Sequence, residues 1–134
     1  MTDAAGELKE ASLRGAHTVP VLRMFSEEAT RAFYLGFLGF KVDWEHRFDA
    51  SSPLYCQISR DDVVLHLSGH HGDGSPGIVV FVRMRGLAAF HAEISAKGYR
   101  HMRPGIEPRD WGREMTVIDP SGNRIRFTEP MGAT

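Results

Sequence analysis

Histidine is the residue type in this chain that most readily suggests chemistry, because its ring nitrogens bind divalent metals and move protons near neutral pH. His66, His70 and His71 lie close together and at first sight resemble a metal cluster. His70 and His71, however, fall in a glycine-rich stretch, where polar side chains are ordinarily exposed to solvent. We therefore expect no metal at this pair. The sequence also shows no nucleophile–base–acid set and no glycine-rich phosphate loop.

The two tryptophans suggest a different chemistry, the stacking of aromatic rings on a planar ligand. Trp111 follows a proline-containing segment, residues 104–110. An indole at the end of such a loop is harder to explain as core than an indole inside a strand. Trp44 falls within a predicted strand, where packing on the core is an equally good interpretation.

The overall charge excludes some classes of partner. Lys plus Arg number 16 and Asp plus Glu number 17, which gives a net charge of -1. This balance argues against a protein that binds nucleic acid or a membrane surface. Four acids near the tryptophans are most simply solvated surface, although they could attract a cationic ligand: Asp43, Glu45, Asp49 and Asp110.

Other features of the sequence favour a cytoplasmic protein. No apolar run reaches the length of a membrane span, and residues 1–15 are too polar for a signal peptide. The single cysteine, Cys56, excludes an internal disulfide and is expected to be a small core residue.

An internal repeat identifies the elements that must position these side chains. The segment VPVLRM at residues 19–24 recurs as VVFVRM at residues 79–84, an offset of sixty, and the same offset relates Leu65 to Ile125. We therefore expect one domain, residues 1–134, built from two duplicated modules. The modules cover about 17–68 and 78–129, and the linker is 69–77.

Each module is predicted to contain one strand, one helix and three further strands. In the first module the strand is 17–24, Ser26 caps the helix, Gly39 ends it, and one helical face carries Ala29, Ala32, Phe33, Gly36 and Phe37. In the second module the strand is 78–84, and the helix buries Leu87, Phe90 and Ile94 before Gly98. The remaining strands are expected at 40–47, 54–59, 63–67, 100–103, 114–119 and 124–128. The predicted fold class is therefore α+β, with two βαβββ modules.

Strand alternation places two polar residues on the side away from the helices. Leu65 and Leu67 share one face of their strand, and His66 points to the other. Ile125 and Phe127 likewise oppose Arg126. We expect His66 and Arg126, sixty residues apart, to occupy equivalent places on the concave faces of the two modules.

The paired βαβββ pattern and several motifs resemble the bleomycin resistance family within the vicinal oxygen chelate, or glyoxalase, superfamily. The motifs are VPVL at 19–22, FY at 33–34 with LGF at 38–40, RDDV at 60–63, WGRE at 111–114, DPSGN at 119–123, and Phe127. They cover most of the chain beyond its first eighteen residues. The combination of WGRE with DPSGN is the most specific of them.

The resemblance also implies where a metal would lie in glyoxalase-type members, which use four side chains from the first and last strands of each module. The matching positions here are Val19, His66, Val79 (or Ile78) and Arg126. Only His66 can act as a ligand, because valine has no donor atom and arginine is a permanent cation. A catalytic metal needs about three protein ligands. We therefore expect no metal and no other cofactor.

The resemblance further implies a homodimer with ligand grooves at its interface. Pro20 and Val21 lie on the first strand, which members of the family often exchange between subunits, and a proline suits an edge strand. Trp111, Trp44 and Phe48 would form the aromatic wall of the groove, although a core role is an alternative for Trp44 and Phe48. His66 would supply a polar contact, and Arg113 and Glu114 would hold the loop of Trp111.

The predicted function is the sequestration of a planar antibiotic such as bleomycin, without catalysis. The alternative from the same superfamily is a metal-dependent glyoxalase-like lyase or dioxygenase. A third hypothesis is that the protein uses the same fold to sense a metabolite. The sequence does not distinguish this role from the sequestration of an antibiotic.

Overall fold

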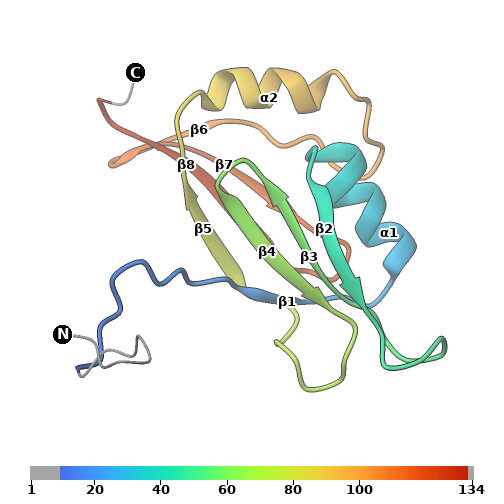
Figure 1. Ribbon diagram of the computed structural model, residues 1–134. Coiled ribbons are helices and arrows are strands. Elements are labelled where there is room, and N and C mark those ends of the chain that lie inside the picture. The colour runs from blue at the N-terminus through green and yellow to red at the C-terminus, as the bar shows by residue number, and fades with distance from the viewer. Residues whose placement is uncertain (1–9, 133–134) are drawn as a thin grey trace.

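The computed structural model describes residues 10–132, so the outer ends of the predicted domain, 1–9 and 133–134, lie outside the described residues. Two four-stranded sheets form the molecule, with strand orders β1-β4-β3-β2 and β5-β8-β7-β6 (Figure 1). In each sheet the first strand of the module runs parallel to the last, and the other pairs are antiparallel. The predicted α+β architecture of two βαβββ modules is confirmed.

The first module contains β1 (Val21–Arg23), α1 (Glu27–Arg31), β2 (Lys41–His46), β3 (Tyr55–Arg60) and β4 (Val63–Ser68). As predicted, the Ser26 hydroxyl caps α1 by accepting a hydrogen bond from the amide of Ala29, and Gly39 adopts φ +77° after the helix.

A π-helical segment, η1 (Ala32–Phe37), continues α1 and changes the buried face of the helix. The predicted stripe at α-helical spacing included Ala32 and Gly36, but both are exposed, whereas Tyr34 is fully buried. The prediction was wrong because bonds such as the one from the amide of Leu38 to the carbonyl of Phe33 span five residues and widen the turn.

The second module contains β5 (Val79–Arg83), α2 (Leu87–Ser95), β6 (Glu107–Arg109), β7 (Gly112–Ile118) and β8 (Arg124–Pro130). Leu87, Phe90 and Ile94 are buried as predicted. The strand expected at 100–103 is absent, and the edge strand lies at β6 instead. Pro104 and Gly105 separate the two places, and Pro108 is tolerated in β6 because an edge strand leaves one row of amides unpaired.

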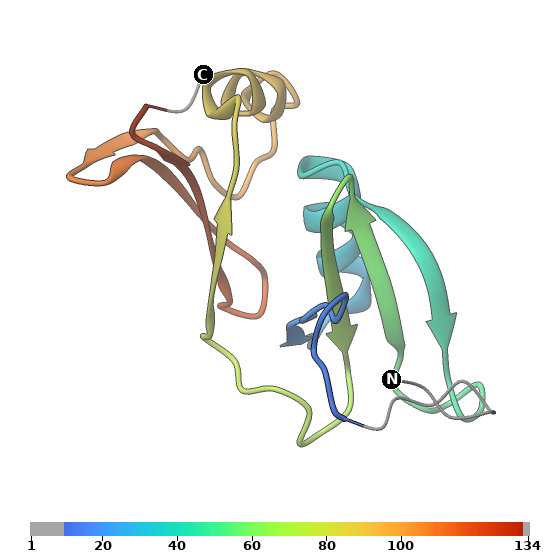
Figure 2. The same cartoon turned by 60° about the vertical axis from the view of Figure 1, so that its left-hand side comes forward.

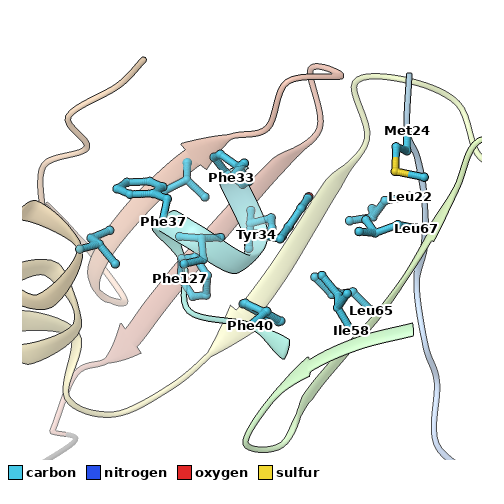
Figure 3. Close-up of a cluster of buried hydrophobic side chains, with 14 of the residues drawn as sticks. Leu22, Met24, Phe33, Tyr34, Phe37, Phe40, Ile58, Leu65, Leu67 and Phe127 are labelled. Carbon is cyan, nitrogen blue, oxygen red and sulfur yellow. The ribbon is translucent and has the colours of Figure 1, made fainter. Parts of the chain in front are cut away.

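One hydrophobic core joins the two modules, and the helices lie inside it. In Figure 2, α1 lies between the two sheets. In Figure 3, Tyr34 of η1 and Phe40 lie between Phe127 of β8 and the leucines of β4. The ring of Phe37 stacks on Tyr99 of the second module at 4.3 Å. Cys56 also belongs to this core, as predicted, and burial raises the pKa of its thiol.

A buried polar contact fixes the modules to each other. The hydroxyl of Tyr34 donates to the carboxylate of Asp119 at 2.7 Å, and Asp119 also accepts from the side-chain amide of Asn123 at 3.0 Å. That amide reaches across to the carbonyl of Arg23 on β1 at 3.0 Å. The DPSGN turn therefore holds the first strand and the first helix at once.

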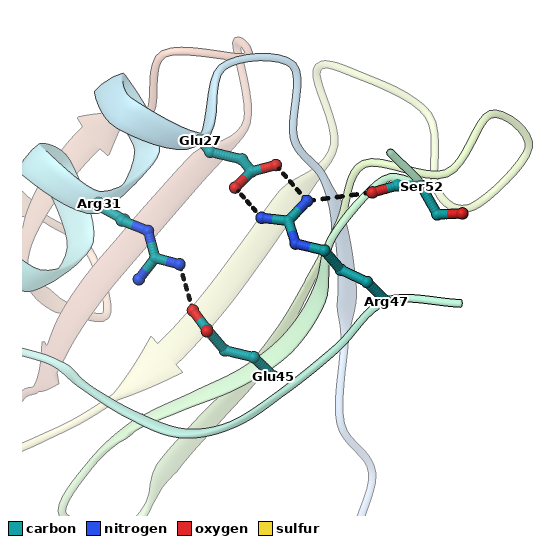
Figure 4. Close-up of polar contacts among 5 residues, drawn as sticks. All are labelled: Glu27, Arg31, Glu45, Arg47 and Ser52. Carbon is teal, nitrogen blue, oxygen red and sulfur yellow. Dashed lines mark hydrogen bonds and ion pairs between the residues drawn. The ribbon is translucent and has the colours of Figure 1, made fainter. Parts of the chain in front are cut away.

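Ion pairs hold β2 against α1. Arg31 pairs with Glu45, and Arg47 pairs with Glu27 and donates to the carbonyl of Ser52 at 3.1 Å (Figure 4). Exposed pairs of this kind add little stability singly, but they leave the carboxylates already partnered.

The linker between the modules is anchored at several points, although its composition suggested a flexible loop. Arg23 donates to the carbonyl of His70 at 2.5 Å, and Ser68 donates to Asp73 at 2.8 Å. Within residues 10–132 no helix is both long and apolar enough to cross a membrane.

Replacing Tyr34 with phenylalanine is expected to lower the free energy of unfolding by about 1–2 kcal/mol, because the change removes a buried hydrogen bond to a carboxylate. Chemical denaturation followed by circular dichroism measures this change. Tyr99→Phe is the matched control, since no hydrogen bond from the Tyr99 hydroxyl joins it to the described residues; equal effects of the two changes would contradict the proposed importance of the contact between modules.

Candidate ligand-binding site

The face of the first sheet that is turned away from the helices carries a connected polar network. The hydroxyl of Tyr55 lies 2.7 Å from Nδ1 of His66, and Nε2 of His66 lies 3.0 Å from the side-chain oxygen of Gln57. Gln57 then donates to Asp43 at 3.1 Å, and Ser59 donates to the other oxygen of Asp43 at 3.0 Å. Each donor along this chain has an acceptor when the Nε2 nitrogen of His66 carries the proton.

The electrostatics of the network favour that arrangement. Burial raises the pKa of the Tyr55 hydroxyl, so this group remains a donor. Hydrogen bonds from Gln57 and Ser59 lower the pKa of the Asp43 carboxyl, so it remains an ionised acceptor. Both ring nitrogens of His66 are therefore already used within the protein.

Trp44 lies over this network. Its ring stacks on Tyr55 at 6.0 Å and meets His66 edge-on at 5.3 Å, and 43% of the residue is exposed. A β-bulge between Val42 and Trp44 brings Asp43 and Trp44 to the same side of the sheet. Trp44 is therefore a residue of the open face and not of the core.

The corresponding face of the second sheet is hollowed into a pocket of about 540 Å³. Trp111 stands at the pocket, and Thr116 and Glu114 reach it from β7. The complete lining consists of Pro104, Gly105, Glu107, Arg109, Trp111, Glu114, Thr116, Arg124 and Arg126.

The charged groups of the pocket differ in whether they have partners. Arg109 pairs with Glu107 at 2.8 Å and approaches Glu114 at 3.5 Å, and Glu114 also accepts from the Thr128 hydroxyl at 2.9 Å. Arg124 and Arg126 are exposed and pair with no carboxylate among residues 10–132.

Trp111 is presented by a tight turn whose backbone is fixed. Asp110 and Trp111 join β6 to β7, and the carbonyl of Trp111 accepts a bond from the amide of Met131 at 2.9 Å. A Cβ at Gly112 would overlap the carbonyl oxygen of Glu129, so only glycine permits this approach of β7 to β8. The indole remains 54% exposed at the end of a rigid hairpin.

Arg113 and Glu114 were predicted together as supports of this loop, but they lie on opposite faces of β7. Glu114 faces the pocket. Arg113 pairs with Glu129, whose carboxylate accepts from the amide of Gly86 at 2.7 Å at the start of α2. The bonds from Arg113 and Gly86 lower the pKa of Glu129. Arg113 thus supports the α2 terminus from the side opposite the pocket.

The other predicted residues of the site lie farther from the pocket. Phe48 is 78% exposed in the loop after β2, where its ring meets His46 and His70. Val21 begins β1, and Pro20 directly precedes it; β1 is an edge strand of its sheet, as predicted. Val21 pairs with His66 of its own chain, and the carbonyl of Pro20 accepts from the His66 amide at 3.0 Å.

A single chain does not bring Trp44 and Trp111 into one groove. The core lies between the two sheets, so the faces that carry these residues point away from each other (Figure 2). His66 and Arg126 occupy equivalent places on these two faces, as strand alternation predicted.

A family model described as a glyoxalase superfamily protein matches residues 5–133, almost the whole chain. The chain belongs to the glyoxalase superfamily. No curated protein matches the chain at a significant level of sequence similarity.

Solved structures of this superfamily superpose on the chain over most of its length. The bleomycin-binding protein of Streptomyces verticillus, solved with copper(II)-bleomycin, is 27% identical with a TM-score of 0.59, over 84% of this chain and 93% of that one. An antibiotic-binding protein of a Streptomyces species is 18% identical with a TM-score of 0.61, over 85% and 96%. A glyoxalase-related enzyme of Clostridium phytofermentans is 21% identical with a TM-score of 0.67, over 85% and 94%. The family model thus confirms the predicted membership of the glyoxalase superfamily, and these structures share its fold.

The residues of this superfamily protein do not fit the metal that glyoxalase-type members hold. Strand pairing sets Val21 beside His66 and Phe81 beside Arg126, so the first strand of neither module offers a ligand at these places. His66 already uses both ring nitrogens, and a guanidinium at Arg126 would repel a dication. Across residues 10–132 no group of three histidine, cysteine or acidic residues could hold a metal ion.

Several residues of the two faces were missed by reasoning from the sequence. Tyr55 and Gln57 share strand parity with Ser59, so alternation along β3 could have identified them. Asp43 had been noted only as one of four acids near the tryptophans, and alternation could not place it on this face because the bulge breaks the alternation. Arg109 was not identified because residues 104–110 were expected to form a loop, whereas Glu107–Arg109 form a strand.

We expect the purified protein to carry no stoichiometric transition metal, even after incubation with Zn²⁺, Ni²⁺ or Mn²⁺ followed by desalting. Elemental analysis per protein chain is the measurement. One bound equivalent in the wild type that disappears in His66→Gln would show that His66 is a metal ligand and would contradict this expectation.

Proposed function

We propose that the protein binds a planar small molecule such as an antibiotic, bleomycin among the candidates, and protects against it by sequestration and not by catalysis. The observation that carries the proposal is Trp111, a half-exposed indole held by a rigid hairpin at a 540 Å³ pocket. Stacking on such a ring recognises any flat ligand, and the pocket lies in the size range of small-molecule sites.

Exposed apolar residues around the pocket support the proposal that this face of the sheet binds a ligand or another protein chain. Val79, Phe81 and Ile118 stand beside the pocket and are 47%, 49% and 42% exposed. Large side chains gathered on one face of a sheet are characteristic of interaction sites. A bound ligand together with a second protein chain would cover them.

A homodimer is part of the proposal. The faces of Trp44 and Trp111 point apart in one chain, so a second copy could set its first sheet against the second sheet of its partner. Each groove would then have Trp111 and Arg126 on one wall, and Trp44 and His66 of the other copy on the opposite wall. β1 pairs with β4 of its own chain, so this arrangement needs no exchange of strands.

We expect sedimentation velocity at micromolar concentration to give a particle of twice the 15.0 kDa chain mass. Phe81→Glu, which places a charge on the open face, should yield monomers. Ala92→Glu is the matched control on the exposed side of α2 and should remain a dimer. A monomeric wild type would rule out the shared groove.

Trp111→Ala is expected to weaken binding of a planar ligand several-fold without unfolding the protein, since stacking contributes about 1 kcal/mol. The measurement is the dissociation constant for metal-loaded bleomycin and for other planar antibiotics, obtained by isothermal titration calorimetry, because Trp111→Ala leaves Trp44 as the one remaining tryptophan of the chain. Phe25→Ala, which removes an aromatic ring that is 63% exposed and distant from the pocket lining, is the control and should bind as the wild type does. Unchanged affinity in Trp111→Ala would show that the ligand lies elsewhere, and the absence of binding by every planar antibiotic would contradict the function.

A further inference from the structure

Two neighbouring arginines on the open face of the second sheet have no role in holding the fold. Arg124 and Arg126 are alternate residues of β8, so their side chains emerge on the same side about 7 Å apart. Both line the pocket, both are exposed, and neither pairs with a carboxylate in the described part of the chain.

The carboxylates that share the pocket do not cancel this charge. Glu107 is paired with Arg109. Glu114 is buried, with its oxygens toward Arg109 and the Thr128 hydroxyl. The lining thus carries three arginines and two glutamates, a net charge of +1, and Arg124 and Arg126 are the cations that have no carboxylate partner among residues 10–132.

The acids of the first open face and the adjoining β2 region are already engaged as well. Asp43 accepts from Gln57 and Ser59, Glu45 pairs with Arg31, and Asp49 accepts from the amide of Ser51 at 2.9 Å. If a second copy brings its first sheet to the pocket, these carboxylates arrive with partners of their own. Only Glu45 has a cationic partner, because Asp43 and Asp49 accept hydrogen bonds from neutral groups and keep their charge. The positive charge that would select a ligand is therefore the net charge of the pocket lining itself.

Three of the four residues that pair with the two arginines across the strands are apolar, and the fourth is Thr116, which pairs with Arg126. Strand pairing sets Phe81 next to Arg126, and both Val79 and Ile118 next to Arg124, while Trp111 stands at the pocket. Guanidinium groups bind carboxylates through paired, charge-assisted hydrogen bonds, and aromatic surfaces bind flat rings. A ligand with a flat aromatic body and an acidic group matches both features.

We propose that the pocket selects aromatic ligands that carry an anionic group, with Arg124 and Arg126 binding the anion and Trp111 stacking on the ring. This inference rests on the proposed function and adds the charge of its ligand. It separates this protein from a binder of cationic drugs, because the charge that selects the ligand here is positive.

Three naphthalene derivatives of matched shape test the charge: naphthalene-2-carboxylate, the neutral 2-carboxamide and the cationic 2-methylammonium. The readout is the indole N–H resonance of Trp111 in ¹H–¹⁵N spectra, assigned with Trp111→Phe. We expect the carboxylate to bind about tenfold more tightly than the amide and the cation to bind most weakly. Arg126→Gln should remove most of this preference and leave the affinity for the amide nearly unchanged.

Arg100→Gln is the matched control, because Arg100 is exposed but does not line the pocket, and it should keep the preference. Equal affinity for all three probes, or tighter binding of the cation, would overturn the anionic selectivity while the stacking function stands. If no probe shifts the Trp111 resonance, the anionic selectivity fails, whereas the binding function is decided separately by the titrations with planar antibiotics. Loss of the dimer in Arg126→Gln, measured by sedimentation, together with unchanged carboxylate selectivity would assign Arg126 to the interface and overturn its role in binding the anion.

Discussion

The shared core between the two sheets is the constraint on which the rest of the structure depends. The helix α1 with its η1 extension packs against both modules, and the bond from Tyr34 to Asp119 secures that position. Because the apolar face of each sheet is used inward, the opposite faces must look outward. Every residue proposed to meet a ligand lies on one of these outward faces, with the exception of Arg113, which supports α2, and Phe48, which lies in a loop.

The internal repeat and the alternation of side chains along the strands correctly predicted those parts of the fold that depend only on regular spacing in the sequence. An offset of sixty residues identified the modules, and alternation placed His66 and Arg126 correctly on equivalent faces. Failures occurred where a local irregularity changes the period. The π-helical turn buried Tyr34 in place of Ala32, the bulge moved Asp43 to the face of Trp44, and Pro104 with Gly105 shifted the edge strand to β6.

The sequence alone did not reveal which charged side chains pair with one another. A net charge of -1 does not distinguish one charged residue from another. In the fold, however, Asp43 and Glu45 have partners, whereas Arg124 and Arg126 pair with no carboxylate among residues 10–132. The fold of this superfamily supports binding proteins and enzymes alike, so the chemistry of a member depends on which side chains its open faces leave unpaired.

The insertion of η1 between the modules also has a consequence for synthesis of the chain. A ribosome releases residues 10–68 before Asp119 exists, so at that moment Tyr34 has no acceptor and Phe37 has no Tyr99 to cover it. The first half would expose an apolar helix face of the kind that promotes aggregation in partly made chains. Its native packing requires the second half, so we expect the duplicated modules to fold as one cooperative unit despite their internal symmetry.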